Sequence, residues 1–178
     1  ESLTPRLIGI LAKSAPLHDI GKVGIPDHIL LKPGKLTPEE WVVMKTHAKL
    51  GSDAIEAAER DAEHAIEFLA TAKEIAHWHH EKWDGSGYPD GLAGEAIPVS
   101  ARLMALADVF DALISKRVYK EPMSVEKATQ VIIEGRATHF DPAVVDAYLA
   151  GQATFVDIAR RYADTDESLI AKAASLGP

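Results

Sequence analysis

Four stretches of the 178-residue chain carry histidine and carboxylate side chains of the kind that bind metal ions. The gaps between them are 28, 32 and 28 residues, so each stretch falls in a separate part of the chain. A helical bundle can bring such side chains together at its centre, as the metal sites of helix bundles do. The candidate ligands are His18, Asp19, His47, His79, His80 and Asp108.

The adjacent histidines at positions 79 and 80 favour a metal site more strongly than any single histidine does. A lone histidine on an apolar stripe is more often a satisfied core residue, and we interpret His64 in that way. Two neighbouring buried imidazoles are costly unless something satisfies both. Because the chain has no cysteine, a metal would be held by His, Asp and Glu, which suit Fe, Mn, Ni or Zn.

The elements that must position these residues are predicted to be helices. Thr37, Pro38 and Glu40 form a start signal for one long helix. Its buried stripe would contain Trp41, Met44, Ala48, Gly51, Ile55 and Ala58. Further helices are expected over about 64–80, 99–115 and 124–134, from Asp141 onward, and within 152–175. Pro16 predicts a helix end or kink in residues 14–24, glycines and prolines predict a loop over 84–98, and no strand is predicted.

The composition excludes several classes of protein. The net charge of −8 disfavours non-specific nucleic-acid binding, which depends on Lys and Arg, so no DNA partner is expected. We see no signal peptide and no apolar run that could span a bilayer, so we predict a cytoplasmic location and no membrane contact by this domain. Since residue 1 is not methionine, we expect the chain to be part of a longer protein.

The ordered motifs resemble a known family. His18-Asp19-Ile20-Gly21-Lys22 is similar to the HD signature of metal-dependent phosphohydrolases. With His79-His80-Glu81, Asp84-Gly85 and Gly87-Tyr88-Pro89, the set resembles the HD-GYP family. The resemblance covers roughly residues 7–150 and includes KTH at 45–47, ADVFDAL at 107–113, RVYK at 117–120 and HFDP at 139–142.

The resemblance implies an all-α bundle of the HD superfamily, with a central di- or trinuclear metal site and residues 1–178 forming the HD-GYP domain. The implied activity is hydrolysis of the bacterial second messenger cyclic di-GMP to linear pGpG and, in many members, GMP. The implied cofactors are two or three divalent ions, with Fe or Mn favoured over Ni, Zn, Co or Mg. The implied partners are an upstream sensory or receiver domain and signalling proteins of the diguanylate-cyclase type.

The resemblance also implies roles for individual residues. The six candidate ligands would bind the metals, and Asp19 would bridge two of them. Asp19 and Lys22 would be catalytic, with Lys22 stabilising charge on the phosphate or protonating the leaving oxygen. The residues expected to contact substrate are Gly87, Tyr88, Pro89, Arg117 and Lys120. The alternative interpretations give these residues no functional role. Lys22 would then be a solvated lysine, and the glycine-rich loop would be only a tight connection. Arg117 and Lys120 would be cations at a surface helix end, where they interact favourably with the helix dipole.

One departure from the family pattern bears on the number of metals. Family members usually carry a further His, and sometimes a Glu, upstream of the HD pair, whereas no His precedes His18 here. Two metals are therefore the expectation, and a third remains open. Two alternative functions also remain: an HD-type phosphohydrolase acting on another nucleotide, and a non-catalytic module that binds a ligand or partner.

Overall fold

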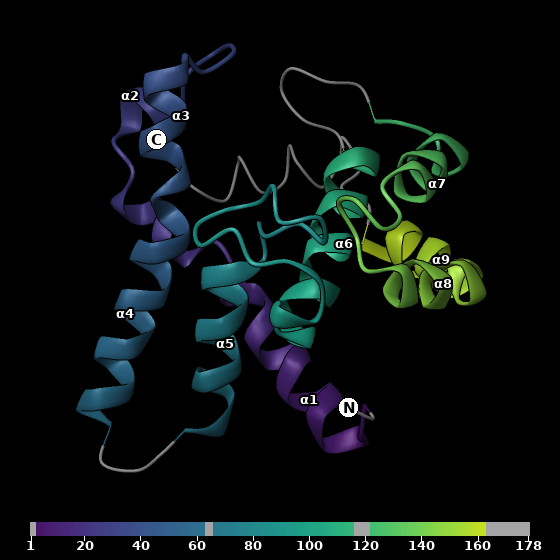
Figure 1. Cartoon of the computed structure of the whole chain (residues 1–178), viewed down its shortest axis with the longest axis horizontal. Coiled ribbons are helices and arrows are strands. Elements are labelled where there is room, and N and C mark those ends of the chain that lie inside the picture. The colour runs from purple at the N-terminus through teal and green to yellow at the C-terminus, as the bar shows by residue number, and fades with distance from the viewer. Residues whose placement is uncertain (1–2, 63–65, 116–121, 163–178) are drawn as a thin grey trace.

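The computed structural model describes residues 3–62, 66–115 and 122–162, which form an assembly of helices (Figure 1). Within these ranges there is no strand, and only two isolated β-bridges join loop residues. The all-α prediction is confirmed. The elements are α1 (Pro5–Ser14), the 3₁₀ helices η1 (Ala15–Leu17) and η2 (Ile20–Gly24), α2 (Asp27–Leu30), α3 (Pro38–Lys45), α4 (His47–Asp61), α5 (Glu67–Trp78), η3 (Gly94–Ala96), α6 (Val99–Ile114), α7 (Val125–Glu134), α8 (Pro142–Ala150) and α9 (Gln152–Tyr162).

The first helix ends where the sequence predicts. Thr4 caps α1, with its hydroxyl accepting a hydrogen bond from the Leu7 amide, and Pro5 occupies the first helical position. The helix stops at Ser14, and the chain continues through η1 and η2. The buried Ser14 hydroxyl donates to the Phe68 carbonyl, which joins the end of α1 to α5.

The prediction of a single long helix after Thr37 is wrong, because the helix is interrupted at Thr46. The capping box between Thr37 and Glu40 is present, but α3 ends at Lys45 and α4 begins at His47. The Thr46 hydroxyl donates to the Val43 carbonyl at 2.7 Å, and the Thr46 amide bonds to the same carbonyl at 3.0 Å. These local bonds to the preceding turn compete with the regular helical ladder.

The predicted buried stripe is correct only in its central part. Ala48, Gly51 and Ile55 are buried on α4, whereas Trp41 is 48% exposed and Ala58 is also exposed. No residue of α3 is buried. The periodicity therefore identified the inner face of α4 but not the fact that α3 lies at the surface.

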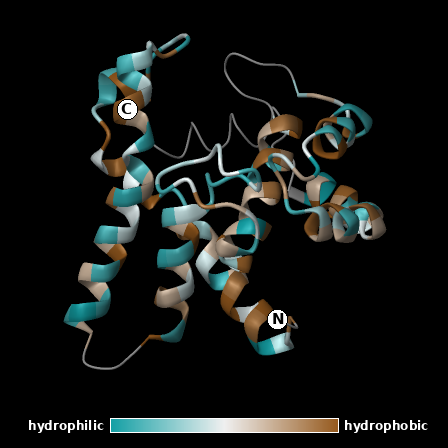
Figure 2. Ribbon diagram, viewed as in Figure 1, coloured by the Kyte–Doolittle hydropathy of each residue, from teal (hydrophilic) through white to brown (hydrophobic). Residues whose placement is uncertain are grey.

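Two apolar clusters hold the bundle together, and Figure 2 colours the hydrophobic residues along the helices that contribute to them. The first lies between α4 and α5, which pack side by side, and contains Ile55, Leu69, Ala72 and Ala76. The second joins α6 to α7 and α8 and contains Leu106, Phe110, Ala128, Ile132, Phe140, Val145 and Tyr148. α5 also packs on α6, and this contact connects the helices of the first cluster to those of the second.

The remaining predicted helices are present with small shifts of their ends. The helix expected over 64–80 is α5, which begins at Glu67, and His64 lies outside the described residues. Ser124 caps α7 and Asp141 caps α8, with Pro142 at the first position of α8. In the tail, α9 extends to Tyr162, and the rest of the predicted tail helix lies outside the described residues.

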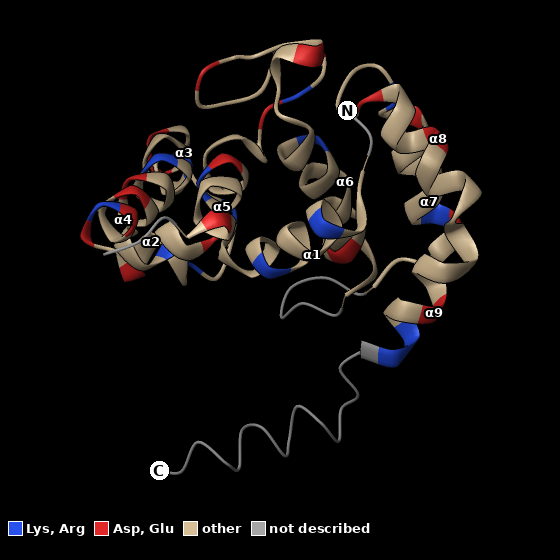
Figure 3. Cartoon of the chain, turned by 90° about the horizontal axis from the view of Figure 1, so that it is seen from below, with Lys and Arg blue, Asp and Glu red and all other residues tan. Residues whose placement is uncertain are grey.

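Figure 3 marks the positions of the charged residues along the described part of the chain. In this view acidic and basic positions are interspersed on α3, α4 and α5. None of the helices in the described ranges has the length and hydropathy of a membrane span.

Gly21 permits the closest approach between η2 and α4. A Cβ atom at this position would lie 2.0 Å from the His47 carbonyl oxygen and 2.4 Å from the Gly51 amide nitrogen. Both neighbours are backbone atoms of a helix, so they cannot move aside as a flexible side chain would. The segment that carries His18 and Asp19 therefore lies directly against the first turns of α4.

We expect Gly21→Ala to lower the free energy of unfolding by about 3 kcal/mol, because the added methyl group must push η2 away from α4. Thermal unfolding should show a melting temperature lower by about 10 °C. The matched control is Gly9→Ala, where a Cβ on α1 meets no atom within 4 Å. That change should stabilise the helix by up to about 1 kcal/mol, and equal melting temperatures for the two variants would contradict the close contact.

Candidate metal centre

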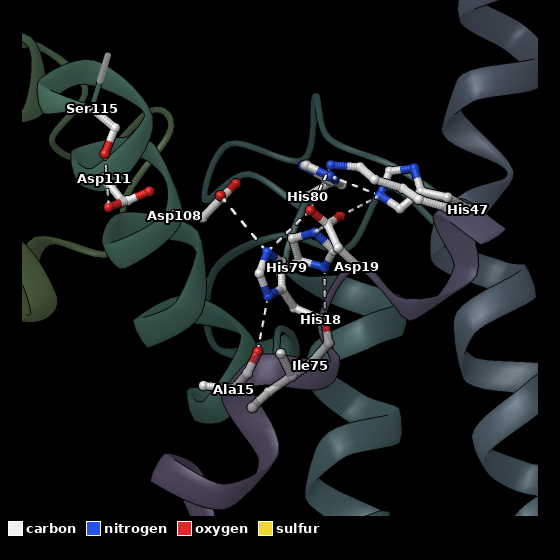
Figure 4. Close-up of polar contacts among 11 residues, drawn as sticks. Ala15, His18, Asp19, His47, Ile75, His79, His80, Asp108, Asp111 and Ser115 are labelled. Atoms are coloured by element: carbon white, nitrogen blue, oxygen red, sulfur yellow. Dashed lines mark hydrogen bonds and ion pairs between the residues drawn. The ribbon is translucent and has the colours of Figure 1, made fainter. Parts of the chain in front are cut away.

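The six predicted ligands converge at one end of the α4–α5 pair (Figure 4). His18 and Asp19 lie between η1 and η2, and His47 is the first residue of α4. His79 and His80 directly follow the last residue of α5. Asp108 lies within α6 and faces His18. Helix ends and short 3₁₀ turns thus supply most of the ligands, while α6 supplies one from its middle.

Four of these side chains form a compact group on one side of Asp19. One ligand atom from each of Asp19, His47, His79 and His80 lies within 4.8 Å of all the others. Oδ1 of Asp19 is 3.5 Å from Nε2 of His47 and 3.9 Å from Nε2 of His79. The Nε2 atoms of His47 and His80 are 3.1 Å apart.

The second oxygen of Asp19 faces a different set of groups. Oδ2 lies 3.2 Å from Nε2 of His18 and accepts a hydrogen bond from the Lys22 ammonium group. Nε2 of His18 is also 3.9 Å from Oδ1 of Asp108. The two oxygens of the Asp19 carboxylate therefore face two different groups of side chains.

Backbone carbonyls orient three of the imidazoles. Nδ1 of His18 bonds to the Ala15 carbonyl at 2.8 Å, and Nδ1 of His47 bonds to the Met44 carbonyl at 2.7 Å. Nδ1 of His79 bonds to the Ile75 carbonyl at 2.8 Å. Because the carbonyl oxygen can only accept, Nδ1 carries the proton in each ring, and Nε2 keeps its lone pair in His47 and His79, and in His18 when that ring is uncharged. This arrangement is typical of metal-binding histidines.

The pKa values divide the site into two electrostatic environments. Burial lowers the pKa of His79 to about 4, and burial with the neighbouring His79 and His47 lowers the pKa of His80 to about 2. Burial also lowers the pKa of His47. Burial acts in the same direction on His18, but the hydrogen bonds to Asp19 and to the Ala15 carbonyl outweigh it and raise its pKa. At neutral pH the three imidazoles beside Oδ1 are therefore uncharged.

The residues present fit a bound cation. Oδ1 of Asp19 and Nε2 of His79 are buried and have no hydrogen-bond partner among the described residues. A buried lone pair without a partner is costly, and a divalent cation would satisfy both. Nε2 of His47 and Nε2 of His80, 3.1 Å apart, are close enough for one ion to bind both. The group can thus hold metal, with histidine and carboxylate as donors.

The glycine-rich loop lies against the same site. The Tyr88 ring stacks on the His80 ring, with centroids 4.8 Å apart and planes inclined by 25°. Burial, followed by the Asp19 and Asp108 carboxylates, raises the pKa of the Tyr88 phenol well above its ordinary value. A Cβ atom at Gly87 would lie 2.3 Å from the Lys82 amide nitrogen, so this glycine permits a close return of the loop. Pro89 is exposed at the outer edge.

Two predicted substrate contacts cannot be placed in this geometry. Arg117 and Lys120 lie outside the described residues. Their predicted contact with substrate therefore rests on the sequence alone.

A carboxylate that sequence reasoning overlooked holds the loop in place. Glu81 is 2% exposed, and its Oε1 accepts hydrogen bonds from the amides of Asp90 at 2.7 Å and Gly91 at 3.0 Å. Oδ2 of Asp90 accepts from the Trp78 indole at 2.8 Å and lies 3.2 Å from Nε2 of His77. The sequence signal that could have indicated this role is the position of an acidic residue directly after two adjacent histidines.

The comparisons with known proteins agree with this geometry. Residues 5–144 match the HD domain family. A probable cyclic di-GMP phosphodiesterase of Vibrio cholerae is 59% identical over 170 residues, which cover 96% of this chain and 38% of that protein. A 3'3'-cGAMP-specific phosphodiesterase 2 of the same organism is 44% identical over 149 residues, which cover 84% of this chain and 27% of that protein. The chain thus spans roughly a third of the length of these curated relatives.

A solved structure has the same fold. The crystal structure of a cyclic GMP-AMP specific phosphodiesterase of Vibrio cholerae, V-cGAP3, superposes with a TM-score of 0.59. The alignment covers 90% of this chain and 44% of that chain, at 22% identity. At this identity the likeness supports the helical architecture alone.

We expect metal binding to release protons mainly from His18 as the pH falls toward its raised pKa. A metal displaces the proton of a histidine ligand, and the lowered pKa values of the other three imidazoles leave them fewer protons to release than His18 has. Titration of Mn²⁺ by calorimetry in buffers of different ionisation enthalpy should detect up to about one proton released per chain near pH 6.5, and less at pH 8. His18→Gln should remove the increase in proton release between pH 8 and pH 6.5, and an unchanged increase in that variant would contradict the assignment.

Proposed function

The chain belongs to the HD domain family and carries the motifs of the HD-GYP type, and from this premise we propose that it hydrolyses cyclic di-GMP in a metal-dependent reaction. The observation that carries the proposal is the position of Asp19, whose two oxygens face separate groups of candidate ligands. The relatives named as cyclic di-GMP phosphodiesterases support the choice of substrate. The proposed products are pGpG and, after a second cleavage, GMP.

The proposed cofactors are two divalent cations, Fe or Mn in preference to Ni, Zn, Co or Mg, with a third ion left open. Oδ1 of Asp19 with His47, His79 and His80 would hold one ion, and Oδ2 of Asp19 with His18 and Asp108 would hold the other. Two such ions supply a hydroxide nucleophile near neutral pH and bind the phosphoryl oxygens. The low pKa values of His79 and His80 keep these ligands deprotonated at that pH.

Lys22 and Asp19 are the proposed catalytic residues. The Lys22 ammonium group bonds to Oδ2 of Asp19, which holds a positive charge beside the position where the phosphate would bind. From there Lys22 could stabilise the charge that develops on the phosphate, or donate a proton to the leaving oxygen. The hydrogen bonds from His18 and Lys22, which outweigh the effect of burial, keep the pKa of Asp19 well below its ordinary value.

The loop after the histidine pair is proposed to form one wall of the substrate groove. Gly87 permits the backbone of the loop to approach closely. Tyr88 places a neutral phenol near the carboxylates of Asp19 and Asp108, and Pro89 is an exposed residue of the same loop. Arg117 and Lys120 would bind the second phosphate of the substrate, a role for which arginine and lysine are suited.

The relatives' greater length supports a further proposal about the whole protein. We expect residues 1–178 to be the catalytic domain, joined in the full protein to an upstream sensory or receiver domain. Acting in the cytoplasm, it would degrade the messenger made by proteins of the diguanylate-cyclase type. These roles follow from the proposed substrate.

A second candidate substrate is a mixed cyclic dinucleotide. The relative named as specific for 3'3'-cGAMP is 44% identical, so the same framework accommodates a change of base. A non-catalytic binding module is less well supported, because all six candidate ligands are retained and converge.

We expect Asp19→Asn to remove both metal and activity, because the neutral amide cannot replace a bridging carboxylate. Metal content by plasma mass spectrometry should fall severalfold, and turnover of cyclic di-GMP by at least about 1000-fold. The matched control is Asp53→Asn on α4, since Asp53 is exposed and pairs only with Lys49 among the described residues. That control should keep wild-type metal content and turnover. Wild-type turnover in Asp19→Asn would refute the proposed centre.

A panel of substrates separates the candidate functions. Protein loaded anaerobically with Fe²⁺ or Mn²⁺ should hydrolyse cyclic di-GMP at least about tenfold faster, in kcat/KM, than 3'3'-cGAMP, which corresponds to a difference of about 1.4 kcal/mol. The reverse order would identify the mixed dinucleotide as the substrate. Tight binding of cyclic di-GMP without product, with every metal tested, would favour the non-catalytic module.

A further inference from the structure

His80 differs from the other three imidazoles in how its ring is held. His18, His47 and His79 each bond through Nδ1 to a backbone carbonyl. The only hydrogen-bond contact of the His80 ring with a described residue runs from Nε2 to Nε2 of His47. Since Nε2 is the atom that faces the candidate ligands, that contact would not hold the ring once a metal is bound. Another group must therefore fix its orientation.

The Tyr88 ring is placed to do this. It stacks nearly parallel to the His80 ring, at a centroid distance of 4.8 Å and an angle of 25°. The Tyr88 amide also bonds to the His80 carbonyl at 3.2 Å, so backbone and side chain both join the two residues. Stacking of aromatic rings is favourable beyond the buried area and restricts rotation of the imidazole.

Tyr88 is itself held firmly by the loop. The loop backbone passes Gly87 so closely that a Cβ atom there would lie 2.5 Å from Cα of Glu81. The Glu81 carboxylate binds the amides of Asp90 and Gly91, which closes the loop on the far side of Tyr88. The Lys45 ammonium group lies 5.1 Å from the Tyr88 ring centroid, within the range of a cation–π contact.

We propose that Tyr88 is a positioning residue for the metal ligand His80, with its ring replacing the backbone carbonyl that orients the other imidazoles. The inference rests on the proposed metal centre and adds a role for the loop within it. The ring, and not the hydroxyl, carries this role. The hydroxyl makes no hydrogen bond to a described residue, so the contacts that hold Tyr88 against His80 are those of its ring and backbone.

The two roles of Tyr88 predict different results for two substitutions. Tyr88→Phe keeps the ring, so it should keep the affinity for metal and lose only contacts of the hydroxyl with substrate. Tyr88→Leu keeps apolar bulk but removes the ring, so it should weaken metal binding. A tyrosine that served substrate alone would leave metal affinity unchanged in both variants.

The test is a titration of metal-free protein with Mn²⁺ by calorimetry, without substrate. We expect Tyr88→Leu to weaken the affinity by about 10- to 100-fold, the usual effect of removing a group that orients a ligand. Tyr88→Phe should remain within about threefold of the wild type. Tyr88→Trp, which restores a stacking ring, should recover most of the affinity and covers the case in which Tyr88→Leu does not fold.

The matched control is Trp41→Leu, which removes a half-exposed aromatic ring from α3, where no residue is buried. It should bind Mn²⁺ as the wild type does. Wild-type affinity in Tyr88→Leu, or loss of affinity in both Tyr88→Phe and Tyr88→Trp, would overturn the proposal. Failure of the metal centre itself would appear separately, as unchanged Mn²⁺ affinity in His80→Ala.

Discussion

The close packing of η2 against the first turns of α4 is the constraint on which the centre depends. Gly21 lies two residues after Asp19, and its missing side chain allows the backbone of η2 to touch the backbone of α4 at His47 and Gly51. This contact sets the distance from the Asp19 carboxylate to the His47 imidazole. The break at Thr46 serves the same end, because it makes His47 the first residue of a new helix.

The second determinant is the division of charge around Asp19. On one side, burial keeps three imidazoles neutral, and two carbonyl bonds help aim their lone pairs inward. On the other side, His18 and Lys22 place positive charge, or the capacity for it, beside Oδ2. The single carboxylate thus separates a region of neutral imidazoles from a region of positive charge.

The sequence predicted the helical class, most helix ends and the six converging residues, because caps, prolines and the ordered motifs are local signals. The break at Thr46 and the exposure of Trp41 could not be predicted from periodicity, since the apolar pattern continues through both. Glu81 and Asp90 were missed because their partners are backbone amides and an indole brought together by the fold of the loop. The stacking of Tyr88 on His80 likewise depends on the return path of the backbone past Gly87.

The unsatisfied lone pairs of Asp19 and His79 have a thermodynamic consequence for the whole domain. A protein that buries such groups is less stable alone than with the ion that satisfies them, and each tenfold rise in free ion above its dissociation constant adds about 1.4 kcal/mol to stability. The robustness of the domain would then follow the availability of the ion in its surroundings. Scarcity would reduce the amount of folded protein as well as its capacity for chemistry.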